Sequence, residues 1–292
     1  MMDDDIHRTD DGRVRMRSGR SAIVHTAGAA AETAPVAVMH YGTPHTGRHP
    51  AVIAQLAEEL GVRLIAVTRP GFAGTDRHLG RSVADAAAEV VEVLEGLELR
   101  GEAAPREVVT VGYSGGGPHA LAFASLLPDR VREVGVFGCP APYDGSVEWF
   151  AGMAGNGGGL RPAAEGRVSR EAHQSSAEFD PESFTAADLA ALDGRWAGIG
   201  EDAQAAFALG SDMGEIDDDL AFVAPWGFDL DRITARVSLF QAEDDRIIPS
   251  HHAVRLKRLL PGAEARFLKG SGHVAILDAL PEWMRAAVAR LS

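Results

Sequence analysis

A serine flanked by glycines is the feature of this sequence best suited to chemistry. Residues 112–116 read Gly-Tyr-Ser-Gly-Gly, directly after the apolar run Val108–Val111. If a strand turns sharply into a helix here, it holds the Ser114 hydroxyl exposed, and the positions two before and two after must be small. A chain with 33 glycines can match the pattern by chance, but most chance matches do not fall at a strand-to-helix junction. The sequence therefore predicts that Ser114 is a nucleophile.

The carboxylate that would support such a serine lies on a later loop. The strand predicted at Val237–Gln241 is followed by Glu243, Asp244 and Asp245. A carboxylate just past the carboxyl end of a strand lies where sites form in open α/β sheets, and it would fix the tautomer of a histidine base. The residues themselves do not select among the three acids, and at least one of them must be a solvated loop charge.

His273 is the histidine best placed to act as the general base. Of the 11 histidines, it is the one that follows both the acidic loop and the last predicted strand, with glycines close on its N-terminal side. Acyl transfer needs a group that accepts the serine proton and returns it to the leaving group. We expect His251 and His252, at the start of a predicted helix, to lie at the surface.

Two backbone N–H groups are candidates for the oxyanion hole that acyl transfer requires. One belongs to Gly115, the residue after the nucleophile. The other should lie on the loop after the strand predicted at Val36–His40, which reads Tyr-Gly-Thr-Pro. Thr43 is the best candidate on this loop, because Gly42 leaves room and Pro44 has no N–H to donate.

Three histidines close to this loop, His40, His45 and His49, raise the alternative of a metal site. The intervening glycines and proline prevent a helix from bringing them onto one face. The chain also has neither an H-E-x-x-H motif nor a carboxylate cluster beside them. We therefore expect no metal ion, and acyl transfer by a serine needs no organic cofactor.

Short apolar runs alternate with helical patterns along most of the chain, which predicts parallel βαβ units. The first half has predicted strands at 36–40, 62–67, 108–111 and 131–137, and predicted helices at 50–60, 82–97 and 118–127. The rhythm resumes late in the chain with strands at 237–241 and 265–268 and helices at 250–260 and 277–291.

This rhythm breaks after Cys139. Residues 141 to about 232 contain no clear strand, and helical patterns cover 180–192, with Thr185 as a cap, and 201–209. We expect a helical cap at 141–232, inserted into an α/β core made of 1–140 and 233–292. Large apolar cap residues could line the substrate pocket, although such residues are more often buried for packing. The candidates are Trp149, Phe150, Met153 and Trp226, together with Phe222 and Phe228.

Composition limits the class of partner. The chain has 292 residues and a formal net charge of −14, which argues against nucleic acid or an anionic membrane, because both attract cationic surfaces. The acidic N-terminal stretch has no apolar core of a secretory signal, and no run is long enough to span a membrane. The single cysteine cannot form an internal disulfide, so the cytoplasm is the expected compartment.

Five segments together resemble the α/β-hydrolase superfamily, most closely its capped bacterial members. They are YGTP (41–44), TRPGFAGTD (68–76), GYSGGGPHALA (112–122), DDRIIP (244–249) and SGH (271–273). The resemblance implies the α/β-hydrolase fold, a mostly parallel sheet flanked by helices. It also implies Asp245 as the triad acid, four residues before the proline, and supports Thr43 as an oxyanion donor. Tyr41 stands where the family usually has histidine.

The expected reaction is two-step hydrolysis of a small-molecule carboxylic ester, thioester or lactone by Ser114, His273 and Asp245. Serine at position 114 argues against the haloalkane dehalogenase and epoxide hydrolase branches, which use aspartate. A ligand-binding receptor on a hydrolase scaffold is one alternative. Another is a proline-releasing aminopeptidase, a class that binds the substrate amino group with cap carboxylates, although we expect Asp217–Asp219 to be a solvated turn. The acidic cap residues are Glu201, Asp202, Asp212, Glu215, Asp217, Asp218 and Asp219.

Overall fold

The computed structural model describes residues 12–99, 106–176 and 180–291, so the acidic stretch 1–11 lies outside the described residues. Within this part, eight strands form one sheet in the order β1-β2-β4-β3-β5-β6-β7-β8. All neighbouring strands from β4 to β8 pair in parallel, whereas β2 runs antiparallel to β1 and β4. The strands are β1 (Arg13–Arg15), β2 (Ser21–Gly28), β3 (Val36–His40), β4 (Arg63–Val67), β5 (Val108–Tyr113), β6 (Val131–Phe137), β7 (Arg236–Ala242) and β8 (Glu264–Leu268).

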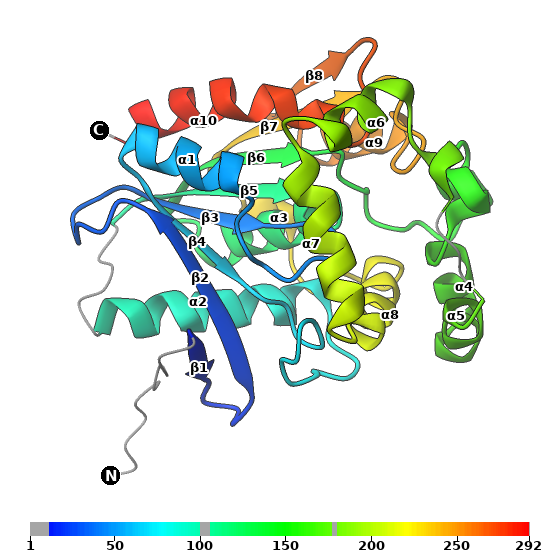
Figure 1. The fold of residues 1–292 in the computed structure, drawn as a ribbon, viewed down its shortest axis with the longest axis horizontal. Coiled ribbons are helices and arrows are strands. Elements are labelled where there is room, and N and C mark those ends of the chain that lie inside the picture. The colour runs from blue at the N-terminus through cyan, green and yellow to red at the C-terminus, as the bar shows by residue number, and fades with distance from the viewer. Residues whose placement is uncertain (1–11, 100–105, 177–179, 292) are drawn as a thin grey trace.

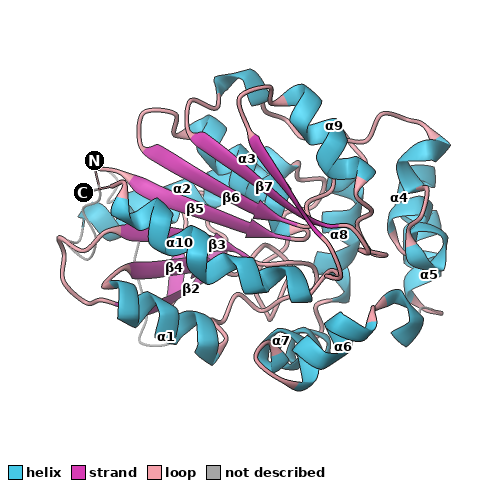
Figure 2. Cartoon of the chain, turned by 90° about the horizontal axis from the view of Figure 1, so that it is seen from above, coloured by secondary structure: helices cyan, strands magenta, loops and turns pink. Residues whose placement is uncertain are grey.

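Helices cover both faces of this sheet (Figures 1 and 2). Those that follow the strands are α1 (Ala51–Leu60), α2 (Val83–Leu99), α3 (Gly116–Leu126), α9 (His251–Leu259) and α10 (Leu280–Ala289). Buried residues of α1 and α10 form one hydrophobic cluster with the sheet, and those of α2, α3 and α9 form another on the opposite face. The molecule therefore has three layers, with the sheet in the middle.

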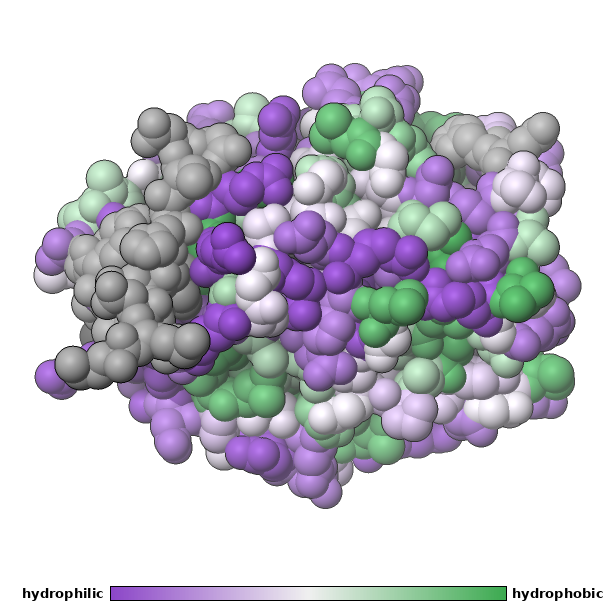
Figure 3. Space-filling model, turned by 90° about the horizontal axis from the view of Figure 1, so that it is seen from below, coloured by the Kyte–Doolittle hydropathy of each residue, from purple (hydrophilic) through white to green (hydrophobic). Residues whose placement is uncertain are grey.

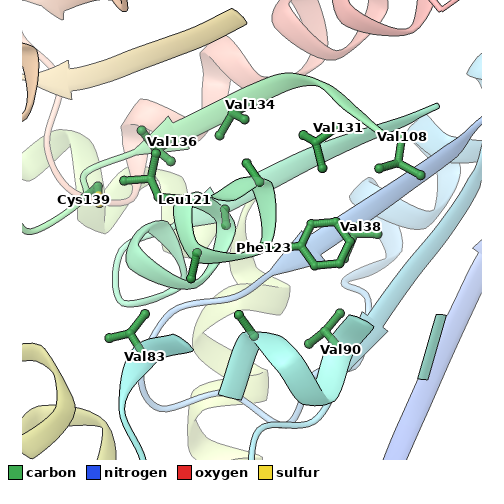
Figure 4. Close-up of a cluster of buried hydrophobic side chains, with 14 of the residues drawn as sticks. Val38, Val83, Val90, Val108, Leu121, Phe123, Val131, Val134, Val136 and Cys139 are labelled. Carbon is green, nitrogen blue, oxygen red and sulfur yellow. The ribbon is translucent and has the colours of Figure 1, made fainter. Parts of the chain in front are cut away.

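The second cluster combines valines of the sheet with apolar residues of α2 and α3. Figure 4 shows Leu121 and Phe123 of α3 between the valines of β5 and β6 and those of α2. Helix α3 is buried along nearly its whole length because strands cover one side of it and α2 the other. This packing fixes the helix that follows Ser114 in the centre of the molecule.

The described residues between β6 and β7 hold helices and short 3₁₀ turns but no strand, and we call residues 141–232 the helical segment. Its elements are η1 (Val147–Phe150), η2 (Ala154–Gly157), α4 (Leu160–Glu165), α5 (Arg167–Gln174), η3 (Pro181–Ser183), α6 (Ala186–Asp193), α7 (Ala197–Ala208), α8 (Asp212–Phe222) and η4 (Leu230–Arg232). Figures 1 and 2 place α4 to α8 beyond the carboxyl ends of the parallel strands. The last 3₁₀ turn, η5 (Ala275–Ala279), follows β8.

The predicted alternation of strands and helices is confirmed, and Thr185 caps α6 as expected. Two strands were not predicted, β1 and β2. They form an antiparallel hairpin at the edge of the sheet, where β2 alternates buried residues such as Val24 with half-exposed ones. The prediction for His252 is wrong: its side chain is fully buried and its Nδ1 accepts a hydrogen bond from the Ala141 N–H at 3.1 Å.

The surface is a mixture of polar and apolar residues. Figure 3 shows hydrophilic residues over much of one face, with hydrophobic ones in separate small groups between them. Across the described residues, no helix combines the length and the apolar character needed to cross a membrane.

Candidate active site

The loops that carry the predicted chemistry emerge at one edge of the sheet. Strands β3 and β5 are neighbours, and β6, β7 and β8 follow in order, all parallel. The loops after β3, β5, β7 and β8 therefore meet where the strands end, which is the edge at which open α/β sheets form their sites. The helical segment lies beyond the same edge (Figure 2).

Ser114 lies in a tight turn between β5 and α3. Its φ of 53° is in the left-handed region, which is unusual for a residue with a side chain. A Cβ atom at Gly112 would approach the Gly116 carbonyl oxygen to 2.6 Å, and one at Gly116 would approach the His40 carbonyl oxygen to 1.9 Å. The glycines are therefore required by the close approach of backbone segments, as expected for the positions two before and two after the serine.

His273 lies between Ser114 and Asp245. Its Nδ1 is 2.8 Å from Asp245 Oδ2, and its Nε2 is 2.9 Å from Ser114 Oγ. An ionised carboxylate only accepts, so Nδ1 carries the proton and Nε2 of the neutral ring is free to accept from the serine hydroxyl. The structure thus brings together the three residues that the sequence singled out.

Asp245 is held in place by the part of its own loop that follows it. Its Oδ1 accepts hydrogen bonds from the N–H groups of Ile247 at 2.9 Å and Ile248 at 2.8 Å, and the residue is buried. Glu243 and Asp244 are exposed instead. The carboxylate beside the imidazole is therefore that of Asp245.

The surroundings of His273 stabilise its protonated form relative to a histidine in water. Burial lowers the pKa of His273, but the charge and hydrogen bond of Asp245, together with the charge of Asp188, outweigh it and raise this pKa above 6.5. Tyr113 packs against the ring at 5.4 Å between centroids. Burial raises the pKa of Tyr113 far above 10.0, so the phenol stays neutral.

The two expected oxyanion donors lie next to each other. A Cβ atom at Gly115 would be 2.5 Å from Thr43 Oγ1, and one at Gly42 would be 3.2 Å from the Cβ of Ser114. Within the described part of the chain, neither the Thr43 N–H nor the Gly115 N–H donates to another protein group. Among the described residues, both N–H groups are therefore without a protein acceptor, as the proposed oxyanion role requires.

Arg69 and Asp218 hold the loop that carries Thr43, a role that the sequence did not reveal. Arg69 donates to the carbonyl oxygens of Tyr41 and Gly42, both at 2.6 Å, and through its Nε to Asp218 Oδ2 at 2.9 Å. The Thr43 hydroxyl donates to the same carboxylate oxygen at 2.6 Å. An arginine from the loop after β4 and an aspartate from α8 thus fix the backbone of the β3 loop.

Asp218 is fully buried and also accepts from Arg81 at 2.6 Å. Burial alone would raise the pKa of Asp218, but Arg69 and Arg81 hold it well below 3.8. The prediction of a solvated turn at Asp217–Asp219 is therefore wrong. These residues lie on α8, and all three are buried because each pairs with at least one arginine.

The apolar candidates of the helical segment fall into two groups. Trp149, Phe150 and Met153 form a small buried cluster in which the Trp149 Nε1–H donates to the Ala141 carbonyl oxygen at 3.0 Å. Trp226 belongs to the main core. Phe222 lies beside the site, because its ring would lie 3.0 Å from a Cβ at Gly115.

A cleft lies beside the loop that carries Asp245. This cleft of about 550 Å³ is lined by Phe184–Ala186 and Glu243–Arg246, and this lining includes Asp245 but not Ser114.

Of the three histidines considered for a metal site, His40 packs against Phe123, and His45 lies 2.7 Å from the carboxylate of Asp202. His49 contacts the Tyr41 hydroxyl, and the ring of the same tyrosine stacks on His45 at 4.0 Å between centroids.

Comparisons with known proteins agree with this architecture. A profile of the alpha/beta hydrolase family matches residues 28–287. The uncharacterized hydrolase YcgS of Bacillus subtilis (strain 168) is 32% identical over 98 residues, which cover 34% of this chain and 32% of that protein. The matched region is thus about a third of that relative's length.

Solved structures extend the similarity to nearly the whole chain. The enol-lactonase from Burkholderia xenovorans LB400 has a TM-score of 0.65 at 16% identity, covering 94% of this chain and 96% of that one. The esterase EaEST from Exiguobacterium antarcticum has a TM-score of 0.63 at 19% identity, covering 96% and 98%. At this identity the likeness concerns the fold, which agrees with the eight-stranded sheet.

Proposed function

Because this chain belongs to the alpha/beta hydrolase family, we propose that it hydrolyses a small-molecule carboxylic ester, thioester or lactone. Ser114, His273 and Asp245 are the proposed catalytic triad. The observation that carries the proposal is the continuous hydrogen-bond chain from Asp245 through His273 to the Ser114 hydroxyl.

The proposed reaction has two steps. Ser114 Oγ attacks the carbonyl carbon while His273 Nε2 takes its proton, and the oxyanion accepts from the N–H groups of Thr43 and Gly115. His273 then protonates the leaving group, which departs and leaves an acyl-serine. Water, deprotonated by the same imidazole, releases the acid and restores the serine. Asp245 stabilises the imidazolium in both steps.

Esters, thioesters and lactones are the preferred substrate class because their leaving groups depart more easily than an amine. Two of the similar structures, an enol-lactonase and an esterase, act on bonds of this class according to their names. Ester hydrolysis also needs no further group, since the proposed triad and donors supply the nucleophile, the proton transfers and the oxyanion contacts.

We further propose that residues 141–232 act as a lid over a core made of 1–140 and 233–292. Phe222 against Gly115 and Asp218 against Thr43 support this role, because both contacts join α8 to the oxyanion loops. A lid excludes water and shapes the acyl pocket.

The aminopeptidase alternative receives less support from the acidic residues of the helical segment. The buried carboxylates of Asp217, Asp218 and Asp219 are already paired with arginines. Asp202 accepts from the N–H and hydroxyl of Thr46. A substrate ammonium group would have to displace one of these partners, so no observation favours this activity.

Labelling with a fluorophosphonate probe followed by ester turnover tests the proposal. We expect the label on Ser114 by mass spectrometry and multiple turnovers of p-nitrophenyl acetate. Ser114→Ala should take no label and should lose about 10⁴-fold or more in kcat while keeping its unfolding temperature. Activity of Ser114→Ala within tenfold of the wild type would refute the mechanism, and labelling without multiple turnover would indicate a receptor.

A further inference from the structure

Asp188 connects helix α6 to the loop that carries His273. Its carboxylate Oδ2 accepts from the N–H and the hydroxyl of Thr185, at 3.0 and 2.9 Å, and completes the capping box of the helix. Its other oxygen, Oδ1, accepts from the N–H of Val274 at 2.6 Å and of Ala275 at 3.0 Å. One carboxylate thus joins two segments that are far apart in the sequence.

The fit between these two segments is close. A Cβ atom at Gly272 would lie 2.0 Å from Asp188 Oδ2 and 2.4 Å from Thr185 Oγ1, so only glycine is tolerated there. Asp188 itself is 1% exposed. The glycine directly before His273 is therefore explained by the first turn of α6, which packs on the backbone at that point.

We propose that Asp188 is a positioning residue for His273, which fixes the backbone of residues 272–275 and places a second negative charge near the imidazole. This inference rests on the proposed function of His273 as a general base. Asp188 contacts no reacting atom in this arrangement and acts through the loop. Its two bonds to consecutive N–H groups just after His273 leave little freedom for the ring to move away from Ser114.

The charges around His273 support an electrostatic part of this role. The groups that face the ring are Asp245, the Ser114 hydroxyl, the neutral phenol of Tyr113 and, from α6, the carboxylate of Asp188. Burial would raise the pKa of Asp188, but the donors from Ala275, Thr185 and Val274 lower it below 3.8, so the group is ionised. Its charge contributes to the raised pKa of His273.

The position of Asp188 also links the base to the helical segment. Helix α6 is followed by α7, and the Trp196 Nε1–H at the start of α7 donates to Asp278 Oδ1 of η5 at 2.8 Å. Asp188 and Trp196 therefore clamp the two ends of α6 onto the chain that follows His273. The proposed positioning of His273 therefore depends on the packing of α6 against this segment.

Three variants separate charge from helix capping. Asp188→Asn removes the charge and keeps one carbonyl oxygen for the loop. Thr185→Ala removes the hydroxyl that caps α6, bonded to the Asp188 N–H at 3.1 Å, and keeps the charge. Asp193→Asn makes the same chemical change as Asp188→Asn at an exposed position of the same helix.

Two measurements serve these variants. The first is the pKa of His273 by NMR titration, with the resonance assigned through His273→Gln, which does not require the protein to be a hydrolase. The second is the pH dependence of the rate of labelling of Ser114 by a fluorophosphonate. In Asp188→Asn we expect the His273 pKa to fall by roughly half a unit and the labelling rate to fall roughly 10- to 100-fold.

In Asp193→Asn both quantities should match the wild type, and Thr185→Ala should lower the unfolding temperature without lowering the His273 pKa. The inference is overturned if Asp188→Asn and Asp193→Asn behave alike, or if Thr185→Ala lowers the pKa as much as Asp188→Asn. If the wild type takes no label but Asp188→Asn still lowers the pKa, the proposed hydrolase fails while the positioning contact stands.

Discussion

The Nε2 of His273 lies 2.9 Å from the Oγ of Ser114 although 159 residues separate them in the chain. The contact is possible because the loops after β5 and β8 end at the same edge of the sheet, with β6 and β7 between them. The Asp245 loop follows β7, so a carboxylate reaches the far side of the ring.

Replacing Asp245 by Asn should cripple the enzyme, whereas Asp244→Asn should not. Asp245 is buried and bonded to His273 Nδ1, and its neighbour Asp244 is exposed. An amide lets the imidazole take the wrong tautomer, which costs about 10⁴ in kcat in comparable triads. Steady-state turnover of p-nitrophenyl acetate by the two variants gives the comparison. A larger loss in Asp244→Asn would contradict the assignment.

The activity should fall toward acid as His273 takes up a proton. Burial lowers the pKa of His273, but Asp245 and Asp188 outweigh it, so the pKa lies above 6.5. The general base must be neutral, and a raised pKa moves its titration to higher pH. The acidic limb of kcat/KM against pH should therefore be centred above 6.5. A rate that stays constant well below this pH would contradict the raised pKa of His273.

Asp218→Ala should destabilise the protein more than Asp217→Ala. Removing Asp218 leaves Arg69 and Arg81 buried without their anion, which costs about 3–5 kcal/mol in comparable cases. The arginines that pair with Asp217 have side chains 35% and 31% exposed, so water can replace the lost partner. Urea unfolding measures both variants, and equal losses would argue against the buried network.

Phe222→Ala should change substrate preference more than Trp149→Ala does. The Phe222 ring lies against Gly115, whereas Trp149 is fully buried in a separate cluster. We expect the ratio of kcat/KM for p-nitrophenyl butyrate and acetate to change roughly tenfold in Phe222→Ala, since one methylene contact is worth about 1–3 kcal/mol.

Trp149→Ala serves as the matched control for this preference. It should lower the free energy of unfolding by about 3–5 kcal/mol and leave the ratio near that of the wild type. A larger change of ratio in Trp149→Ala would place the acyl pocket elsewhere in the helical segment.

The sequence indicated the residues around Ser114 because their signals are local. The glycines at 112 and 116 are required by the turn itself, and His273 is marked by the loop that carries it. The network around Asp218 has no such local signal. Its partners Arg69 and Arg81 lie on the loop after β4, 149 and 137 residues away from Asp218. Without these partners, three consecutive aspartates are typical of a solvated turn. Only the resemblance to the α/β-hydrolase superfamily favours Asp245 as the triad acid. The residues alone do not distinguish neighbouring acids on one loop, because their burial depends on the fold.

The antiparallel hairpin of β1 and β2 escaped prediction for a similar reason. Strand β1 has only three residues, and β2 becomes a strand by pairing with β1 and with β4, which lies later in the chain. The contact of Asp188 with the His273 loop was not predicted, because the side chains of a capping box normally bond only within their own helix. Here the same carboxylate continues to the N–H groups of Val274 and Ala275.

The shared counter-ion of Arg69 and Arg81 bears on how the molecule unfolds. Both cations are anchored on the loop after β4, and their anion is on α8. Detaching α8 would leave two buried arginines unpaired, so this helix and the sheet should melt in one cooperative transition. A chimaera that takes residues 141–232 from a relative would need an acid at the position of Asp218. Access for a substrate must then come from movement of parts other than α8.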